Sequence, residues 1–462
     1  MDDVSTNIMS YSEGHSRPRA VRGGRMTTVV GGMLYVAHFA LATPARAQAM
    51  SHPMPSASAQ MGADPIGLPM TRTGSGTAWL PDSAPMYGVM RGAGSWMFMM
   101  MGSLFVQQVI QDGPRGDKQF GSINWGMVNA MRPLGAGRLQ LRAMASLDAF
   151  TVGGSGYPLL LQTGESYNGE PLHDRQHPHD MLMEIAAIYE RALSPGVGLQ
   201  LYGAAAGEPA LGPVAFPHRP AAAADPLATI AHHWQDASHV SFGVATMGVY
   251  TKHVKLEGSA FNGREPDDMR TNIDWNGASL DSYSGRVTIA PSPELALSAS
   301  YGRLTDAEVA HPGEKSRRAV GSALWSRSRP DDMSHSVSVI VGGNSVGDEP
   351  WSKSVTLEGL TDVRGKLQVF ARAEFVEKSG EELVLGEHDE NLYKVSHVSV
   401  GAVRELRAGG FGRLGLGVRG TLNIVPSSLE ALYGSRYPVG VAIYARWRTG
   451  RMVMGGNGAH QH

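Results

Sequence analysis

Apolar and polar residues alternate with a period of two along most of this chain. In the stretch KLQVFARAEFVEK, residues 366–378, every second residue is apolar and these residues share one face: Leu367, Val369, Ala371, Ala373 and Phe375. The stretches RLQLRAMASL (138–147) and RLGLGVRGTLNI (413–424) follow the same pattern. A period of two is typical of β-strands that bury one face. The pattern argues against a helical fold, and it fits either a soluble sandwich or a membrane barrel.

The connections between the strands favour a barrel. The alternation predicts sixteen strands, near residues 95–109, 119–132, 137–147, 181–193, 197–206, 239–250, 252–262, 279–290, 294–303, 317–328, 334–344, 352–361, 365–377, 392–406, 410–424 and 438–448. Short turns such as RPLGAG, SPGVG and APSPE take turns with longer loops. Transmembrane β-barrels have short periplasmic turns, longer outer loops and an even number of strands. We therefore expect an all-β fold, a transmembrane antiparallel β-barrel of about 16 strands.

Such a barrel needs an apolar outer face and permits a polar interior. The predicted outer faces consist of Leu, Val, Ala and Ile. The opposite faces carry charged residues, which a wet lumen allows: Arg142, Lys255, Glu257, Arg372 and Glu374. Whether the lumen is open stays undecided at this point. Aromatic residues near strand ends are expected to form the girdles at the membrane interfaces: Trp96, Trp234, Trp325, Trp351, Tyr393 and Trp447.

The segments outside the strands differ in composition. Arginines from Arg17 to Arg25 precede the apolar run TTVVGGMLYVAHFALA, and Ala45 and Ala47 match a small-x-small cleavage pattern. These features predict a signal peptide over residues 1–47 and localisation in the cell outer membrane. Residues 48–78 are rich in Met, Pro, Ser and Ala without periodicity, so we expect a disordered periplasmic arm. The barrel is expected over residues 79–448 and a C-terminal tail over 449–462.

Charge and cysteine content exclude several functions. The formal net charge is −2 over 462 residues, which leaves no strongly basic face for nucleic acid. The chain has no cysteine, so disulfides and thiolate metal sites are excluded. The expected partners are outer-membrane lipid, together with metal ions or periplasmic efflux components.

Histidines and aspartates gather in two predicted outer loops. The stretch HDRQHPHD (173–180) ends the second loop, and the third loop, about 207–238, holds FPHRP and HHWQDASH. We expect the third loop to fold inward, as in sixteen-strand porins, so that both loops meet near the pore mouth. The candidate metal ligands are His173, Asp174, His177, His179, Asp180, His218, His232, His233 and His239.

Three roles are open to these residues. Imidazole and carboxylate suit zinc or Cu(II), although the spacing matches no standard zinc motif. The same residues fit a structural network that braces the loops against the barrel wall, as Arg175 would with Asp174 or Asp180. An Asp–His pair could also activate water, but no G-x-S-x-G or other nucleophile motif lies nearby. We therefore expect no enzyme, and leave metal contact and structural bracing as alternatives.

Methionines are abundant, with 24 in the chain. In GSWMFMMMGSLF, Met97, Met99 and Met101 share one strand face, and further methionines stand in the predicted arm. Thioethers are soft ligands that select Cu(I) and, by the same softness, silver. The alternative is that methionine serves only as a flexible apolar filler.

Long blocks of the sequence resemble a known family. The blocks GYPLLLQTGESYNGEPLHDRQHPHDMLMEI, GEPALGPVAFPHRP and HHWQDASHVSFGV are similar to those of a poorly characterised family of Gram-negative outer-membrane β-barrel proteins. Its members are often met beside copper and silver efflux genes. A more distant resemblance is to the copper-resistance outer-membrane protein B group, which joins a Met/His-rich periplasmic arm to a barrel. The resemblance implies relevance to metals, with copper ion as the expected bound species.

The sequence thus predicts an outer-membrane β-barrel that binds or passes metal ions, copper first among them, as part of metal resistance. The alternative is a general or solute-selective porin whose histidine-rich loops are structural. A hydrolase that uses Asp–His chemistry in the outer loops is a third hypothesis.

Overall fold

The computed structural model describes residues 63–452, except 275–278, 308–312, 330–331, 387–388, 390 and 410–411. The predicted signal peptide, residues 48–62 of the predicted arm and residues 453–462 of the predicted tail lie outside the described residues.

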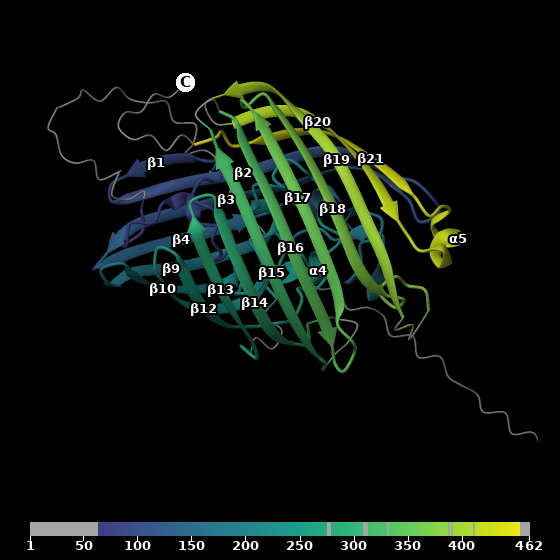
Figure 1. The fold of residues 1–462 in the computed structure, drawn as a ribbon, viewed down its shortest axis with the longest axis horizontal. Helices are drawn as coiled ribbons and strands as arrows, with labels where there is room; N and C mark the ends of the chain where they lie inside the picture. The colour runs from purple at the N-terminus through teal and green to yellow at the C-terminus, as the bar shows by residue number, and fades with distance from the viewer. Residues whose placement is uncertain are drawn as a thin grey trace, which may run out of the picture. The chain divides into compact units, whose positions relative to one another are not determined.

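Within the described residues, sixteen antiparallel strands close into a barrel, because β2 pairs with both β3 and β21. Figure 1 shows the strands running at a common tilt around the barrel. The sixteen strands are β2 (Trp96–Gln111), β3 (Lys118–Leu134), β4 (Gly137–Ala145), β9 (Leu182–Ser194), β10 (Val197–Gly207), β11 (Ser241–Tyr250), β12 (Val254–Phe261), β13 (Ser282–Ser292), β14 (Leu295–Thr305), β15 (Lys315–Ser328), β16 (Ser334–Val346), β17 (Ser352–Val363), β18 (Leu367–Ser379), β19 (Leu392–Gly409), β20 (Gly412–Ile424) and β21 (Val439–Arg448).

Smaller elements decorate the barrel. The short strand β1 (Val89–Ala93) forms a hairpin with the start of β2. The loop between β4 and β9 holds two small strand pairs, β5 (Tyr157–Pro158) with β8 (Arg175–Gln176) and β6 (Glu165–Tyr167) with β7 (Glu170–Leu172). The short α-helices are α3 (Asp148–Thr151), α4 (His232–Gln235) and α5 (Glu430–Tyr433). No helix of the described residues is long and apolar enough to cross a membrane.

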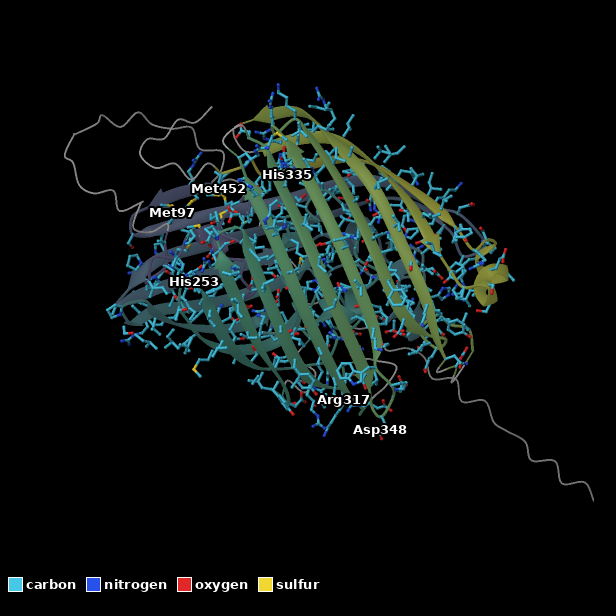
Figure 2. All side chains as sticks on the ribbon, in the orientation of Figure 1. Met97, His253, Arg317, His335, Asp348 and Met452 are labelled. Carbon is cyan, nitrogen blue, oxygen red and sulfur yellow. The ribbon has the colours of Figure 1, made fainter. Side chains whose placement is uncertain are left out.

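The predicted fold class and strands are confirmed. Every end of the sixteen barrel strands lies within three residues of its prediction. Short connections alternate with longer ones around the barrel, which defines a short-turn end and a long-loop end. Figure 2 shows these two ends: Met97, His253, His335 and Met452 lie toward the first, and Arg317 and Asp348 toward the second. The hairpin of β1 was not predicted, because its residues lie beside the start of the first strand without alternation of their own.

The outer face of the barrel is apolar, as predicted. Large side chains that point away from the interior are exposed on nearly every strand, among them Leu141, Leu201, Leu256, Val341, Leu357, Val369, Val400, Leu416 and Ile443. Apolar exposure on this scale is typical of a surface that lies against lipid. The barrel fold and this apolar band indicate an outer-membrane protein.

Chain segments occupy much of the interior, a point that the sequence left open. Arg142, Lys255, Glu257, Arg372 and Glu374 do face inward, but each is less than a tenth exposed. Two segments of the chain cover them, residues 63–88 before the barrel and the loop 208–240 between β10 and β11. Charged side chains on a barrel wall are buried here because chain segments supply ionic and hydrogen-bond partners in place of water.

The segment 63–88 lies inside the barrel at the short-turn end. Residues 63–78 of the predicted disordered arm are therefore ordered, and that prediction is wrong for this half. Lys255 Nζ donates a hydrogen bond to the Thr77 carbonyl at 2.6 Å, and Arg142 donates to the Gly76 carbonyl at 3.0 Å. Apolar and polar residues do not alternate in this segment, so its sequence predicts no strand. Side chains on the barrel wall satisfy its backbone groups, and only the closed barrel provides those partners.

The loop 208–240 folds into the barrel, as predicted for the third outer loop. Arg219 forms ion pairs with Glu358 on β17 (2.8 Å) and with Asp236 at the end of α4 (2.9 Å). Tyr444 on β21 donates a hydrogen bond to the Ala224 carbonyl at 2.8 Å. Trp234, predicted for an interface girdle, is only 1% exposed within this loop. The tryptophan follows the loop inward because its indole finds a hydrogen-bond partner there, the Ser352 hydroxyl.

Candidate metal site in the barrel interior

Two histidine-rich loops meet inside the barrel toward the long-loop end, as predicted. Five imidazoles form what we term the histidine cluster: His177, His179, His232, His233 and His239. Neighbouring ring centroids lie 5.0 Å apart between His232 and His239, and 5.9 Å apart between His177 and His232. Each of the five residues is less than a tenth exposed. The β4–β9 loop supplies the first two, and α4 with the turn after it supplies the other three.

One part of the cluster has the composition of a metal site. Glu165 on β6, His177 and His233 place one ligand atom each within 4.8 Å of one another. The Glu165 Oε1 atom lies 3.0 Å from His177 Nε2 and 3.8 Å from His233 Nε2. Donors that share one ion at bonds of ~2.1 Å lie about 3.4 Å apart in a tetrahedron. The three atoms are therefore spaced as ligands of a single ion would be, with small adjustments.

The hydrogen-bonding state of these imidazoles also fits a ligand role. Among the described residues, His177 Nε2 and both ring nitrogens of His233 have no hydrogen-bond partner of acceptable geometry. The other nitrogen of His177, Nδ1, lies 3.0 Å from the Pro178 carbonyl, which favours a proton on Nδ1 and a lone pair on Nε2. Buried polar atoms without a partner are costly, so each asks for an explanation such as an ion.

Glu165, His177 and His233 are called the Glu165 trio below. Their surroundings favour neutral imidazoles and an ionised carboxylate. Burial lowers the pKa of His177 to about 4 and that of His233 to about 4. Burial alone would raise the pKa of Glu165, but His177 and Arg270 nearby hold that pKa well below its usual value. Neutral imidazole and carboxylate are the forms that bind a metal. Burial, followed by the charge of Glu165, raises the pKa of Glu265, which lies 3.2 Å from His233 Nδ1.

The remaining members of the cluster are held by hydrogen bonds. The Nδ1 atom of His179 lies 2.8 Å from the Asp148 carboxylate, and that of His232 lies 2.8 Å from the Asp236 carboxylate. His239 Nδ1 lies 2.7 Å from the backbone carbonyl of Asp236. Each contact lies within one loop, the first in the β4–β9 loop and the other two in the loop 208–240, and each fixes the orientation of a ring. They brace each loop internally, whereas the structural role considered from the sequence was bracing against the barrel wall.

Four other candidate residues lie outside the trio. His173 is partly exposed and pairs with Asp174, whose carboxylate accepts hydrogen bonds from the Leu161 amide and the Tyr433 hydroxyl. Asp180 pairs with Arg270 at 3.4 Å, and burial raises its pKa to about 7. His218 lies apart from the trio, with Nε2 3.3 Å from the Met144 sulfur. Five of the nine candidates therefore meet in the histidine cluster, and two of them, His177 and His233, are placed as ligands of one ion together with Glu165, which was not a candidate.

Sequence reasoning missed the two carboxylates of this site. Glu165 stands in the GESYNGEPL part of the β4–β9 loop, and Glu265 in FNGREPDD of the β12–β13 loop. Nothing in either stretch shows which acidic residue turns inward. A buried imidazole cluster needs nearby carboxylates. The signal that could have found Glu165 and Glu265 was therefore the presence of acidic residues in the long loops next to the histidines.

Comparisons with known proteins concern the barrel. No protein-family model matches the chain, and no curated protein sequence matches it. OmpF of Salmonella typhi, solved with daunomycin, is 8% identical, with a TM-score of 0.48 over 78% of this chain and 100% of that chain. An anion-selective porin from Comamonas acidovorans is 11% identical, with a TM-score of 0.47 over 76% of this chain and 99% of that chain. OmpT of Vibrio cholerae is 9% identical, with a TM-score of 0.44 over 78% and 100%.

Proposed function

We propose that this outer-membrane β-barrel binds a transition-metal ion, copper in the first place, inside the barrel. Through this site the protein takes part in the passage of the ion across the outer membrane, or in its retention, as part of metal resistance. Glu165, His177 and His233 hold the ion. His179, His232 and His239 orient the loops around it. The protein acts as a binding or transport protein and not as an enzyme, with periplasmic efflux components as its proposed partners.

The observation that carries the proposal is a set of buried ring nitrogens without hydrogen bonds beside an ionised carboxylate. Two imidazoles and one carboxylate suit Zn(II), Cu(II) or Fe(II). An ion at this point would satisfy His177 Nε2 and His233 Nε2 together, and its charge would offset that of Glu165. Copper is proposed over the others because the sequence resembles barrel proteins met beside copper and silver efflux genes.

The direct test is a titration of the refolded full chain with Cu(II), followed by calorimetry and by electron paramagnetic resonance. We expect the protein to bind an ion with nitrogen ligands, and the double variant His177→Ala/His233→Ala to bind it about 100-fold more weakly. The matched controls are His253→Ala and His335→Ala, which remove imidazoles at the short-turn end (Figure 2). Both controls are expected to bind copper as the parent does.

A second variant separates ligation from loop bracing. Glu165→Gln keeps the size and shape of the side chain but replaces the charged carboxylate with a neutral amide. It is expected to weaken binding of Cu(II) and Zn(II) while the barrel keeps its resistance to heat. If Cu(II) binds equally to the parent, the double variant and Glu165→Gln, the cluster is structural and the proposal fails.

The second candidate function is that of a porin whose histidine-rich loops are structural. It is supported by the hydrogen bonds of His179, His232 and His239, which hold these imidazoles within their loops. A general porin also needs an open lumen, and residues 63–88 and 208–240 occupy it in this structure. Conductance in planar bilayers decides between the two: ion flow in the absence of metal would support the porin.

A further inference from the structure

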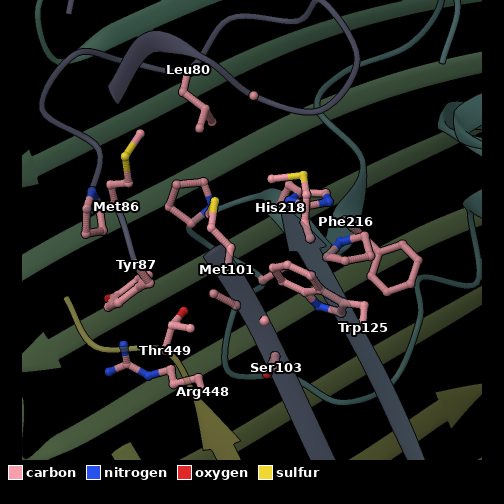
Figure 3. A pocket seen from close by; sticks show the side chains of 18 of the residues that line it. Leu80, Met86, Tyr87, Met101, Ser103, Trp125, Phe216, His218, Arg448 and Thr449 are labelled. Atoms are coloured by element: carbon pink, nitrogen blue, oxygen red, sulfur yellow. The ribbon is translucent and has the colours of Figure 1, made fainter. Parts of the chain in front are cut away.

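A cavity of about 120 Å³ remains inside the barrel between the segment 63–88, the loop 208–240 and strands β2 to β4. Five methionines line it: Met70, Met86, Met99, Met101 and Met127. Figure 3 shows Met86 on one side of Met101, and His218 and Trp125 on its other side. A space of this size admits several waters or an ion with its ligands.

Methionine is concentrated at this place. One cluster beside the cavity consists of methionines alone: Met70, Met86, Met97, Met99 and Met131, with Met90, Met101 and Met452 packed against them. Met127, Met144 and Met183 belong to the adjoining cluster. Elsewhere, the inward positions of strands β13 to β18 carry mainly serine, threonine, arginine and glutamate. Filling of space alone does not explain the concentration of methionines. Leucine, isoleucine and valine are abundant on the outer face and would fill a core as well.

An imidazole completes the donor set. His218 lines the cavity, lies against the Trp125 ring at 4.8 Å between centroids, and places Nε2 3.3 Å from the Met144 sulfur. An imidazole among thioethers is a soft donor set, which selects Cu(I) and Ag(I) over Zn(II) and Cu(II).

The charged residues of the cavity wall are compensated. Arg142 pairs with Glu184 at 3.3 Å, and Arg448 pairs with Glu405 at 3.0 Å. Asp225 also lines the cavity and pairs with Arg419 at 2.9 Å. A monovalent ion would therefore enter a space whose wall carries no uncompensated positive charge from these groups.

The cavity adjoins the histidine cluster. His179 lines the cavity, and its ring lies 5.7 Å from that of His239, a second member of the cluster. The soft donors thus meet the cluster at His179, whereas Glu165 meets it at His177 and His233. The two donor sets differ in the metals they suit.

We propose that the methionine-lined cavity is a second metal site, which takes a soft monovalent ion, Cu(I) or Ag(I), through Met86, Met101 and neighbouring thioethers with His218. The site is independent of the Glu165 trio and stands if that trio binds nothing. No redox step is involved, because the ion enters and leaves as the monovalent cation.

The test measures uptake of Ag(I), added as silver nitrate, by the refolded full chain in chloride-free buffer. The variant is Met86→Leu/Met101→Leu, in which near-isosteric swaps preserve packing. We expect its affinity for Ag(I) to fall by about tenfold or more, while binding of Cu(II) at the trio stays as in the parent. Absorption spectroscopy at the silver edge is expected to show sulfur with nitrogen, and His218→Phe is expected to remove the nitrogen.

The matched control is Met247→Leu, which removes a thioether from the outer face of β11, where Met247 is 60% exposed. Methionines of residues 48–62 are common to all the variants, so any silver they hold cancels in the comparison. Equal affinity of the parent, the double variant and the control for Ag(I) would overturn the second site. The variant His177→Ala/His233→Ala is expected to keep full silver binding, which separates this site from the first.

Discussion

Glu208 is a buried residue at the contact between the loop 208–240 and the segment 63–88. It follows β10 directly and is 4% exposed. Its Cβ lies against Gly76, where an added Cβ would come within 2.8 Å. Among the described residues, its Oε1 atom has no hydrogen-bond partner. Burial raises its pKa to about 8, so the folded protein holds a proton on Glu208 that the unfolded chain releases at its ordinary, lower pKa.

We therefore predict that stability falls as the pH rises from about 5 to about 8. In this range the folded state binds more protons than the unfolded state at Glu208, so a rise in pH favours unfolding until the pH passes the folded pKa near 8. The measurement is the urea midpoint of the barrel in lipid vesicles at several pH values. Glu208→Gln cannot ionise, and its midpoint is expected to fall less over the same range. Parallel curves for the two proteins would contradict the prediction.

At the scale of elements, the loop 208–240 is held by a small number of buried ion pairs. Arg219 is fully buried and bridges the Glu358 carboxylate on β17 and the Asp236 carboxylate in the loop itself. Asp225 of the same loop pairs with Arg372 on β18 and Arg419 on β20. The barrel strands are joined by their own backbone ladders, so the loop can detach without unfolding the barrel.

The substitution Arg219→Ala is predicted to release the loop and open the lumen. Removal of one partner from a buried ion pair costs about 3–5 kcal/mol, because it leaves carboxylates without compensation. We expect higher conductance than the parent in planar bilayers, with an unchanged barrel. The control is Arg264→Ala, whose ion pairs with Asp281 and Asp306 are partly exposed and contribute little. Low conductance of both variants would show that the loop stays in place without Arg219.

At the scale of the whole molecule, the apolar outer face is what a bilayer must cover. Leu357 lies in the middle of β17, opposite Val339 of β16 and Ala373 of β18, and is 49% exposed. Its neighbours on this face are apolar too, and the polar residues of these strands point inward.

Leu357→Arg is predicted to destabilise the barrel in lipid by about 2–4 kcal/mol, the cost of an arginine on the lipid face near the membrane centre. The measurement is the urea midpoint of folding into vesicles. Met269→Arg is the control, because Met269 is 63% exposed in the long β12–β13 loop and is expected to face water. If both variants fold equally well, the outer face of β17 does not contact lipid.

The sequence by itself determined the barrel. Strand positions follow from the two-residue period of side chains, and the face of each residue follows from the same period, as for Leu141 outside and Arg142 inside. Loop lengths set the two ends. These are local properties, because a strand that alternates can bury only one of its faces. The convergence of the two histidine-rich loops was also predicted, from the position of the third loop along the chain.

Tertiary structure alone decided what fills the barrel and which residues meet there. Thr77 reaches Lys255 across 178 positions, and Arg219 reaches Glu358 across 139. Segment 63–78 has no pattern that predicts order, because its partners stand on the barrel wall and not in the segment. The choice of Glu165 beside His177 and His233 was hidden for the same reason. A loop carries no period that fixes side-chain direction, so only packing inside the closed barrel determines which of its charged residues turn inward.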